Sequence, residues 1–231
     1  ASLRLISLLE LDGQLSNAYQ QAKTAASAFN SDIFHAVASD LAIKNSNARE
    51  ARSHFNKLTE DYRQSPQGLL LSGKLMLVDG NAAKAEQILT SVHKQAPSNQ
   101  SVWLLAKALL SGGKTQQAFE LYKGYIESGN SSAELWEHYA ELAIRNSDYA
   151  EAIRGYERVI DLQGDNPKIH NNLAYVLMEE GRLNEALAHS KTAIDMAPDA
   201  YSFLDTHANI LWRQGELVEA IAEYEKLYAQ Q

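Results

Sequence analysis

The hydrophobic positions of this chain follow the spacing of amphipathic helices. Ala51, Phe55 and Leu58 lie at i, i+4 and i+7, and Ala220 and Tyr224 repeat the first part of that spacing near the other end. Because a helix turns once in about 3.6 residues, these side chains share one face and can be buried together. The pattern predicts a series of helices that each pack along an apolar stripe.

Small residues recur in a fixed register of 33 or 34 residues. Each period contains one alanine, and a glycine or serine lies five residues before it. In six of the periods another small residue lies seven residues before that glycine or serine. Small residues in such a register predict a helix, a turn and a second helix packed closely, and this period is typical of a stacked solenoid. The alanines are Ala18, Ala51, Ala85, Ala118, Ala152, Ala186 and Ala220; the glycines or serines are Gly13, Ser46, Gly80, Gly113, Ser147, Gly181 and Gly215; the further small residues are Ser39, Gly73, Ala106, Ala140, Ala174 and Ala208.

The register divides the chain into seven predicted helix pairs, each with a helix A and a helix B. Helix A of the second pair is expected to begin at Asp32, whose carboxylate can cap the free amides of the first turn. Pro66 and Pro167 favour helix starts, because an amide is unpaired at that position in any case. The expected fold class is all-α, a right-handed α-solenoid forming one domain. The repeats are about 1–31, 32–65, 66–98, 99–132, 133–166, 167–200 and 201–231.

Composition narrows the chemistry. The 231 residues are 45% hydrophobic and include no cysteine, which excludes disulfides, thiolate zinc sites and cysteine nucleophiles. No apolar run is long enough for a membrane-spanning helix, so we expect no membrane insertion by this chain. The net charge is −8, with the acidic excess in residues 99–231, which argues against nucleic acid as a partner.

The register resembles the tetratricopeptide repeat (TPR) family over essentially the whole chain. One copy fills the family's positions with His170, Leu173, Ala174, Leu177, Gly181, Ala186, Ser190, Ala193 and Pro198. The preceding copy fills them with Trp136, Tyr139, Ala140, Ser147, Ala152, Tyr156 and Val159. The resemblance implies a scaffold that binds proteins, with its A helices lining a concave groove.

Catalytic and cofactor motifs are missing from the sequence. No phosphate-binding glycine loop, nucleophile elbow or pair of histidines one helical turn apart occurs. Glu137, His138 and Glu141 come closest to a divalent-metal site, but a solvated acidic helix face explains them better. We therefore predict a protein that is not an enzyme and that needs no metal or cofactor.

Positions 2, 5, 6, 9, 12 and 13 of each repeat point into the groove if the TPR resemblance holds. Trp103 and Trp212 could anchor a partner or fill gaps between helices. Asn171 and Asn172 could bridge to a peptide backbone or bond a neighbouring helix. The lysines could form a cationic track or simply be solvated. The predicted partner-binding residues are Lys74, Trp103, Lys107, His138, Lys168, Asn171, Asn172, Tyr175, Asp205, Asn209, Trp212 and Arg213.

Some of these residues match part of a known ligand set. The chaperone-binding TPR group holds a peptide's terminal carboxylate with Lys and Asn residues at fixed positions of successive repeats. Lys168, Asn172 and Asn209 match fragments of that set but not its order. The sequence therefore gives little support for binding a chaperone tail.

Three functions remain open from the sequence. The first is a non-catalytic scaffold that binds a peptide or protein in the groove. The second is a self-associating structural spacer. The last helix is expected to run to Gln231, and where a capping helix would be polar it carries the apolar side chains Leu217, Ile221, Tyr224 and Tyr228. A missing downstream segment would also explain these side chains, and so would packing onto helix A of their own repeat. The third is a regulatory domain that binds a small ligand.

A finer resemblance concerns the setting. The segments 171–177, 185–198 and 202–221 look similar to TPR lipoproteins of bacterial exosortase/PEP-CTERM sorting and exopolysaccharide systems. This implies a bacterial protein of the periplasm or cell envelope rather than the cytoplasm. The chain begins inside a predicted helix A without a starting Met, so we expect a fragment of a longer protein.

Overall fold

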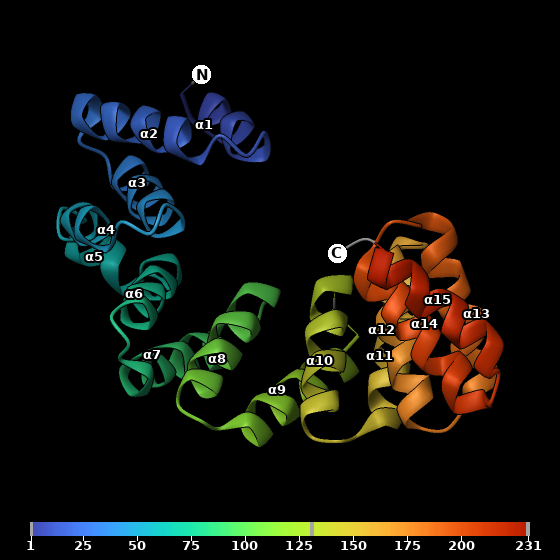
Figure 1. Ribbon diagram of the computed structural model, residues 1–231. Coiled ribbons are helices and arrows are strands. Elements are labelled where there is room, and N and C mark those ends of the chain that lie inside the picture. Colours follow the sequence, from blue (N-terminus) through green and yellow to red (C-terminus); the bar gives the residue numbers. More distant parts are fainter. Residues whose placement is uncertain (1, 130–131, 230–231) are drawn as a thin grey trace. The chain divides into compact units, whose positions relative to one another are not determined.

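The computed structural model describes residues 2–129 and 132–229, and Figure 1 shows that these form helices throughout. No strand occurs in these two stretches, which confirms the all-α prediction. The predicted end of the last helix at Gln231 lies outside the described residues. The helices are α1 (Ser2–Leu11), α2 (Leu15–Phe29), α3 (Asp32–Lys44), α4 (Ala48–Phe55), α5 (Glu60–Gln64), α6 (Pro66–Val78), α7 (Ala82–Gln95), α8 (Asn99–Ser111), α9 (Thr115–Glu127), α10 (Ala133–Arg145), α11 (Tyr149–Gln163), α12 (Pro167–Glu179), α13 (Leu183–Met196), α14 (Tyr201–Gln214) and α15 (Leu217–Ala229).

The chain divides into two compact units, Ala1–Ala118 and Phe119–Gln231, and the division falls within α9. Within each unit, consecutive helices pack on one another, as α6 does on α7 and α12 on α13. In chain order the helices follow the predicted repeats, with α5 added to the second. Helix A packs on helix B in α1–α2, α3–α4, α6–α7, α10–α11, α12–α13 and α14–α15. The prediction of one continuous domain stays a prediction. No helix in the described stretches is both long and apolar enough to cross a membrane.

The repeated glycines occupy the turns between helix A and helix B. All five have positive φ, from 71° at Gly80 to 87° at Gly215. Ser46 and Ser147 replace glycine in two repeats and keep the same left-handed backbone, with φ of 58° and 57°. A side chain is strained there because its Cβ crowds the following carbonyl oxygen, which glycine avoids.

Replacing Ser46 or Ser147 with glycine is expected to raise the free energy of unfolding by about 0.5–1 kcal/mol per site. This is the backbone strain that glycine relieves in the folded protein, less the extra conformational entropy that glycine gives the unfolded chain. Both serines are exposed, so no packing is lost. Thermal unfolding should show a melting temperature higher by about 2 °C for each change. Ser147→Ala is the matched control and should give no gain; an equal gain in alanine would contradict the backbone explanation.

Side-chain sizes compensate across each helix pair. A Cβ on Gly73 of α6 would lie 2.5 Å from Leu89 Cδ2 of α7, so any larger residue would force that leucine to move. In the first repeat Ile6 takes the register position of Gly73, and Ala22 takes that of Leu89. Both are buried in one cluster. The large and small members have exchanged helices, which keeps the core close-packed.

The second repeat departs from the predicted pattern. Helix B was expected to carry Leu58 on its apolar stripe, but α4 ends at Phe55 and Leu58 is buried in the connection to α5. The expected capping role of Asp32 is also wrong. Asp32 accepts a hydrogen bond of 2.8 Å from the Thr59 amide, and the cap of α3 is Ser31 without a side-chain bond. The carboxylate therefore secures the connection instead of its own helix.

Both predicted proline starts are confirmed. α6 begins at Pro66, and the hydroxyl of Ser65 accepts a hydrogen bond from the amide of Gly68. α12 begins at Pro167, and the Asn166 side chain caps that helix. These caps satisfy amides that have no partner within the helix.

Candidate functional site

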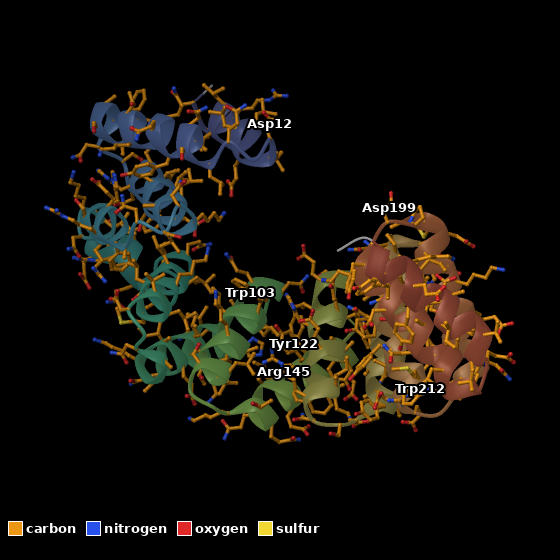
Figure 2. All side chains as sticks on the ribbon, in the orientation of Figure 1. Asp12, Trp103, Tyr122, Arg145, Asp199 and Trp212 are labelled. Atoms are coloured by element: carbon orange, nitrogen blue, oxygen red, sulfur yellow. The ribbon has the colours of Figure 1, made fainter. Side chains whose placement is uncertain are left out.

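A hollow of about 350 Å³ in the first unit brings together three of the predicted binding residues, Lys74, Trp103 and Lys107. They come from the A helices α6 and α8, and α3 supplies the third wall. Figure 2 shows Trp103 on α8. The apolar part of the lining consists of Ile43, Leu77, Val78 and Leu104.

Trp103 and Lys107 form the accessible edge of this hollow. Trp103 is 37% exposed although it is a large apolar side chain. The Lys107 Nζ lies 5.1 Å from the centre of the Trp103 ring, a distance that permits a cation–π contact. Among the residues that the structure describes, Lys107 has no ion-pair partner. The exposed Trp103 ring and the unpaired Lys107 ammonium group therefore lie side by side at the edge of the hollow.

Lys74, in contrast, is engaged within the hollow. Its side chain is 16% exposed and forms an ion pair with Asp40. Lys44 contacts the same carboxylate at 3.0 Å and also pairs with Glu10. Burial alone would raise the pKa of Asp40, but the charges of Lys74 and Lys44 outweigh it and the pKa is lowered. Asp40 therefore holds its charge and fixes Lys74, which is not a freely solvated lysine.

Sequence reasoning missed Asp40 and Lys44, although the register could have found them. Asp40 stands at position 9 of its repeat, as Lys74 and Lys107 do in the next two repeats. Lys44 stands at position 13, which also points into the predicted groove. The hollow is therefore built from equivalent positions of three successive A helices.

In the second unit, several predicted residues already bond within the chain. The Lys168 Nζ donates to Glu137 at 2.7 Å. The Asn172 side chain lies close enough to Tyr156 of α11 to lower the pKa of that phenol, against the larger effect of burial, which raises it. His138 lies 3.6 Å from Glu141, whose carboxylate raises the pKa of this histidine. These groups stabilise helix contacts, and a ligand would have to compete for them.

The Asn171 side chain differs from its neighbour Asn172. Its Oδ1 is buried and has no hydrogen-bond partner among the described residues. A buried acceptor in this state costs roughly 1–3 kcal/mol.

The remaining predicted residues lie on α12 and α14. Tyr175 is half-exposed, and Trp212, labelled in Figure 2, is 58% exposed. Arg213 donates to Glu179 at 2.7 Å. Asn209 accepts from the Tyr224 hydroxyl at 2.9 Å and donates to the backbone oxygen of Asp205 at 2.8 Å. Trp212 and Tyr175 therefore carry the accessible aromatic surface of this unit.

Two histidine pairs, one buried and one part-buried, were not foreseen from the sequence. His35 and His54 join α3 to α4 with their Nδ1 atoms 3.1 Å apart, and His170 and His189 join α12 to α13 at 2.9 Å. The second pair stands 135 residues after the first, in equivalent register. That constant spacing was the available signal. Within the described part of the chain, no group of three His, Cys, Asp or Glu side chains is placed to hold a metal ion.

Comparison with known proteins identifies the repeats. The family model described as the tetratricopeptide repeat protein 21 C-terminal ARM domain matches residues 13–206. The chain belongs to this family. The TPR resemblance is thereby confirmed, whereas the finer resemblance to exosortase-associated lipoproteins stays a prediction.

Solved TPR structures share the fold of this family member. YrrB, described as a TPR protein with an unusual peptide-binding site, has a TM-score of 0.66 and 13% identity, covering 77% of this chain and 92% of its own. The APC/C hetero-tetramer Cut9–Hcn1 has a TM-score of 0.70 and 14% identity, covering 91% of this chain and 42% of its own. At these identities the likeness shows the fold alone.

One curated relative is longer by far. Cellulose synthase operon protein C of Salmonella typhimurium (strain LT2) is 27% identical over 144 residues, which are 53% of this chain and 12% of that protein. The present chain therefore corresponds to a small part of that relative's length.

Proposed function

We propose that this TPR protein is a non-catalytic scaffold and that the hollow between α3, α6 and α8 binds a short extended peptide. The observation that carries the proposal is the pairing of Trp103 with Lys107 at the edge of an apolar hollow. An apolar side chain of the peptide would pack on Trp103, and a neighbouring carboxylate would reach Lys107. The favoured peptide therefore carries an acidic residue beside a bulky apolar one.

The arrangement of Asp40 supports this specificity. It fixes Lys74 and Lys44, so the one lysine of the hollow left for a ligand carboxylate is Lys107. A basic peptide would place its positive charge beside Lys107 with no carboxylate between them, and it would be repelled. Charge at one position then decides between otherwise similar peptides.

The test is a fluorescence-anisotropy titration with labelled peptides that share a leucine and differ only in a neighbouring aspartate, asparagine or lysine. The aspartate peptide should bind best. Trp103→Ala should weaken it by about 30-fold, the loss typical of an interface anchor, and Lys107→Gln should remove the preference for aspartate over asparagine. Each variant should keep the helical circular dichroism of the parent.

Trp212→Ala is the matched control, because it removes an exposed tryptophan from the other unit. Binding should be unchanged in this variant. Loss of binding with Trp212→Ala and not with Trp103→Ala would move the site to the second unit and contradict the proposal for the hollow.

We also propose that the scaffold serves a bacterial exopolysaccharide or envelope export assembly. The support is the similarity to cellulose synthase operon protein C, together with the sequence resemblance to exosortase-associated TPR lipoproteins. Affinity purification of the tagged protein from its own source tests this. Co-purification of polysaccharide-export subunits from the envelope fraction is expected, and recovery of cytoplasmic partners alone would contradict it.

A further inference from the structure

A second hollow, of about 270 Å³, lies in the first unit and is walled by the A helices α1, α3 and α6. We call it the Tyr62 hollow, because α5 adds Tyr62 to its lining. Asp40 lines both this hollow and the one that contains Trp103, so the two adjoin. Figure 1 shows α1, α3, α6 and α8 following one another in this unit. The two hollows are therefore successive positions along one row of A helices.

The Tyr62 side of this hollow comes from the irregular second repeat. Both ends of α5 are fixed: Asp32 accepts a hydrogen bond from the Thr59 amide before α5, and the Ser65 hydroxyl after it donates to the Tyr62 backbone oxygen at 2.7 Å. The α5 backbone lies so close to α6 that a Cβ on Gly68 would be 2.0 Å from that oxygen. The added helix therefore forms a firmly held wall.

The Tyr62 hollow has an apolar lining and no unpaired charge among its described residues. Its two carboxylates, Glu10 and Asp40, both form ion pairs with Lys44. The other described lining side chains are uncharged, and half-buried Leu70 is one of the apolar ones. A charged ligand group would lose water here without gaining a partner. The hollow therefore suits an uncharged, apolar side chain.

Two exposed glutamines add hydrogen-bonding groups to the same lining. Gln67 of α6 and Gln100 of α8 stand at position 2 of successive repeats. A side-chain amide can both donate to and accept from a peptide backbone. Gln100 also lies one helical turn before Trp103 on α8, so this helix contributes to both hollows.

The spacing of the A helices sets the spacing of side chains on a ligand. α3 packs on α6, and α6 packs on α8. Packed helices lie about 8–10 Å apart, and an extended peptide advances about 3.3 Å per residue. One step along the row of helices therefore corresponds to about three peptide residues.

We propose that the Tyr62 hollow binds a second apolar side chain of the same peptide, about three residues from the one that packs on Trp103. This inference rests on the proposed function and narrows its ligand. The ligand is an extended segment with two bulky apolar side chains at that spacing and an acidic residue beside the one on Trp103.

The test lengthens the labelled leucine–aspartate peptide and places a second leucine one, three or five residues from the first, on either side. A serine at each of these positions gives the reference peptides. In anisotropy titrations the second leucine should tighten binding about 10-fold at a spacing of three on one side, and little at the other spacings. No gain at any position, or equal gains at all of them, overturns the inference.

Two variants then locate the gain. Leu70→Gln removes apolar lining, and Ser7→Phe fills the Tyr62 hollow from an exposed position of α1 that takes no part in the core. In both variants the second leucine should give no gain, while the single-leucine peptide keeps its affinity. Leu162→Gln is the matched control, because it changes an exposed leucine of the other unit, and it should keep the full gain.

The same titrations separate the two proposals. A gain that persists in both Leu70→Gln and Ser7→Phe, with normal binding of the single-leucine peptide, overturns the role of the Tyr62 hollow and leaves the proposed function intact. Failure of the single-leucine peptide to bind the parent chain overturns the proposed function and this inference with it.

Discussion

Replacing Tyr139 with alanine is expected to lower the free energy of unfolding by about 3–5 kcal/mol, the usual cost of truncating a fully buried aromatic side chain. Tyr139 is 0% exposed and stacks on Phe119 of the preceding repeat. It also meets Trp136 of its own helix edge to face, with ring centres 5.9 Å apart. Burial, together with the nearby Glu151 carboxylate, raises the pKa of Tyr139, so the ring stays neutral and packed at all ordinary pH.

The effect should be large because a repeat array draws its stability from contacts between neighbours. Urea unfolding followed by circular dichroism measures it. Tyr139→Phe keeps the ring and should cost about 1 kcal/mol or less, and Tyr175→Ala removes a half-exposed tyrosine and should cost about 0.5 kcal/mol. Equal losses for Tyr139→Ala and Tyr175→Ala would contradict the central role of the buried stack.

Acidification is expected to destabilise the protein through its histidine pairs. In each pair the two Nδ1 atoms share one hydrogen bond, so one nitrogen donates and the other accepts. Burial first, and then the charge of the paired histidine, lowers the pKa of His54 and of His189; burial and the charge of Lys57 lower that of His35. In the fully buried pair of His35 and His54, protonating both rings places two donors face to face, which costs roughly 1–3 kcal/mol.

The sign follows from linkage. Because these pKa values are lowered in the folded protein, the unfolded chain takes up protons more readily below about pH 6.5. The stability is fully present above that pH and is lost as the pH falls through the folded pKa values. His138 opposes this trend, because Glu141 raises the pKa of His138 in the folded protein. The stability that His138 contributes is fully present below its unfolded pKa and is lost as the pH rises through its folded pKa. Burial also lowers the pKa of His93 and His207, so the net direction is loss in acid.

Thermal unfolding between about pH 7.5 and about pH 5.5 checks this, since a loss of 1 kcal/mol lowers the melting temperature by about 2–4 °C in a chain of this size. The double variant His54→Gln with His189→Gln removes one titrating ring from each pair while keeping a hydrogen-bonding side chain. Its melting temperature should fall less than that of the parent over the same range. An equal fall in both proteins would assign the acid sensitivity to other groups.

Local regularities in the sequence were enough to predict the repeats. The spacing of Ala51, Ala85 and the other register alanines depends on helix geometry and on the limited space between paired helices, so it recurs wherever the pair recurs. Gly80 and its counterparts mark turns because only glycine enters the left-handed region without strain. The proline starts follow from the chemistry of a single residue.

The hollow could be predicted in part. The register placed Lys74, Trp103 and Lys107 on one face of successive A helices. The register could not show that Lys74 would pair with Asp40 while Lys107 would lie over the Trp103 ring. Long side chains can reach partners in more than one repeat, and the register does not specify which partner they contact. The same limitation applies to Asn172, whose side chain lies beside Tyr156 of the preceding repeat.

The sequence by itself therefore determined the all-α class, the repeated order of helix, turn and helix, and the positions of the turns, because these follow from a period of 33 or 34 residues and from the size of single residues. Only the tertiary structure decided the break between α4 and α5, the binding of Asp32 to Thr59 and the pairing of His35 with His54. The two contacts join residues 27 and 19 positions apart in the chain, where no helical period specifies which side chains meet.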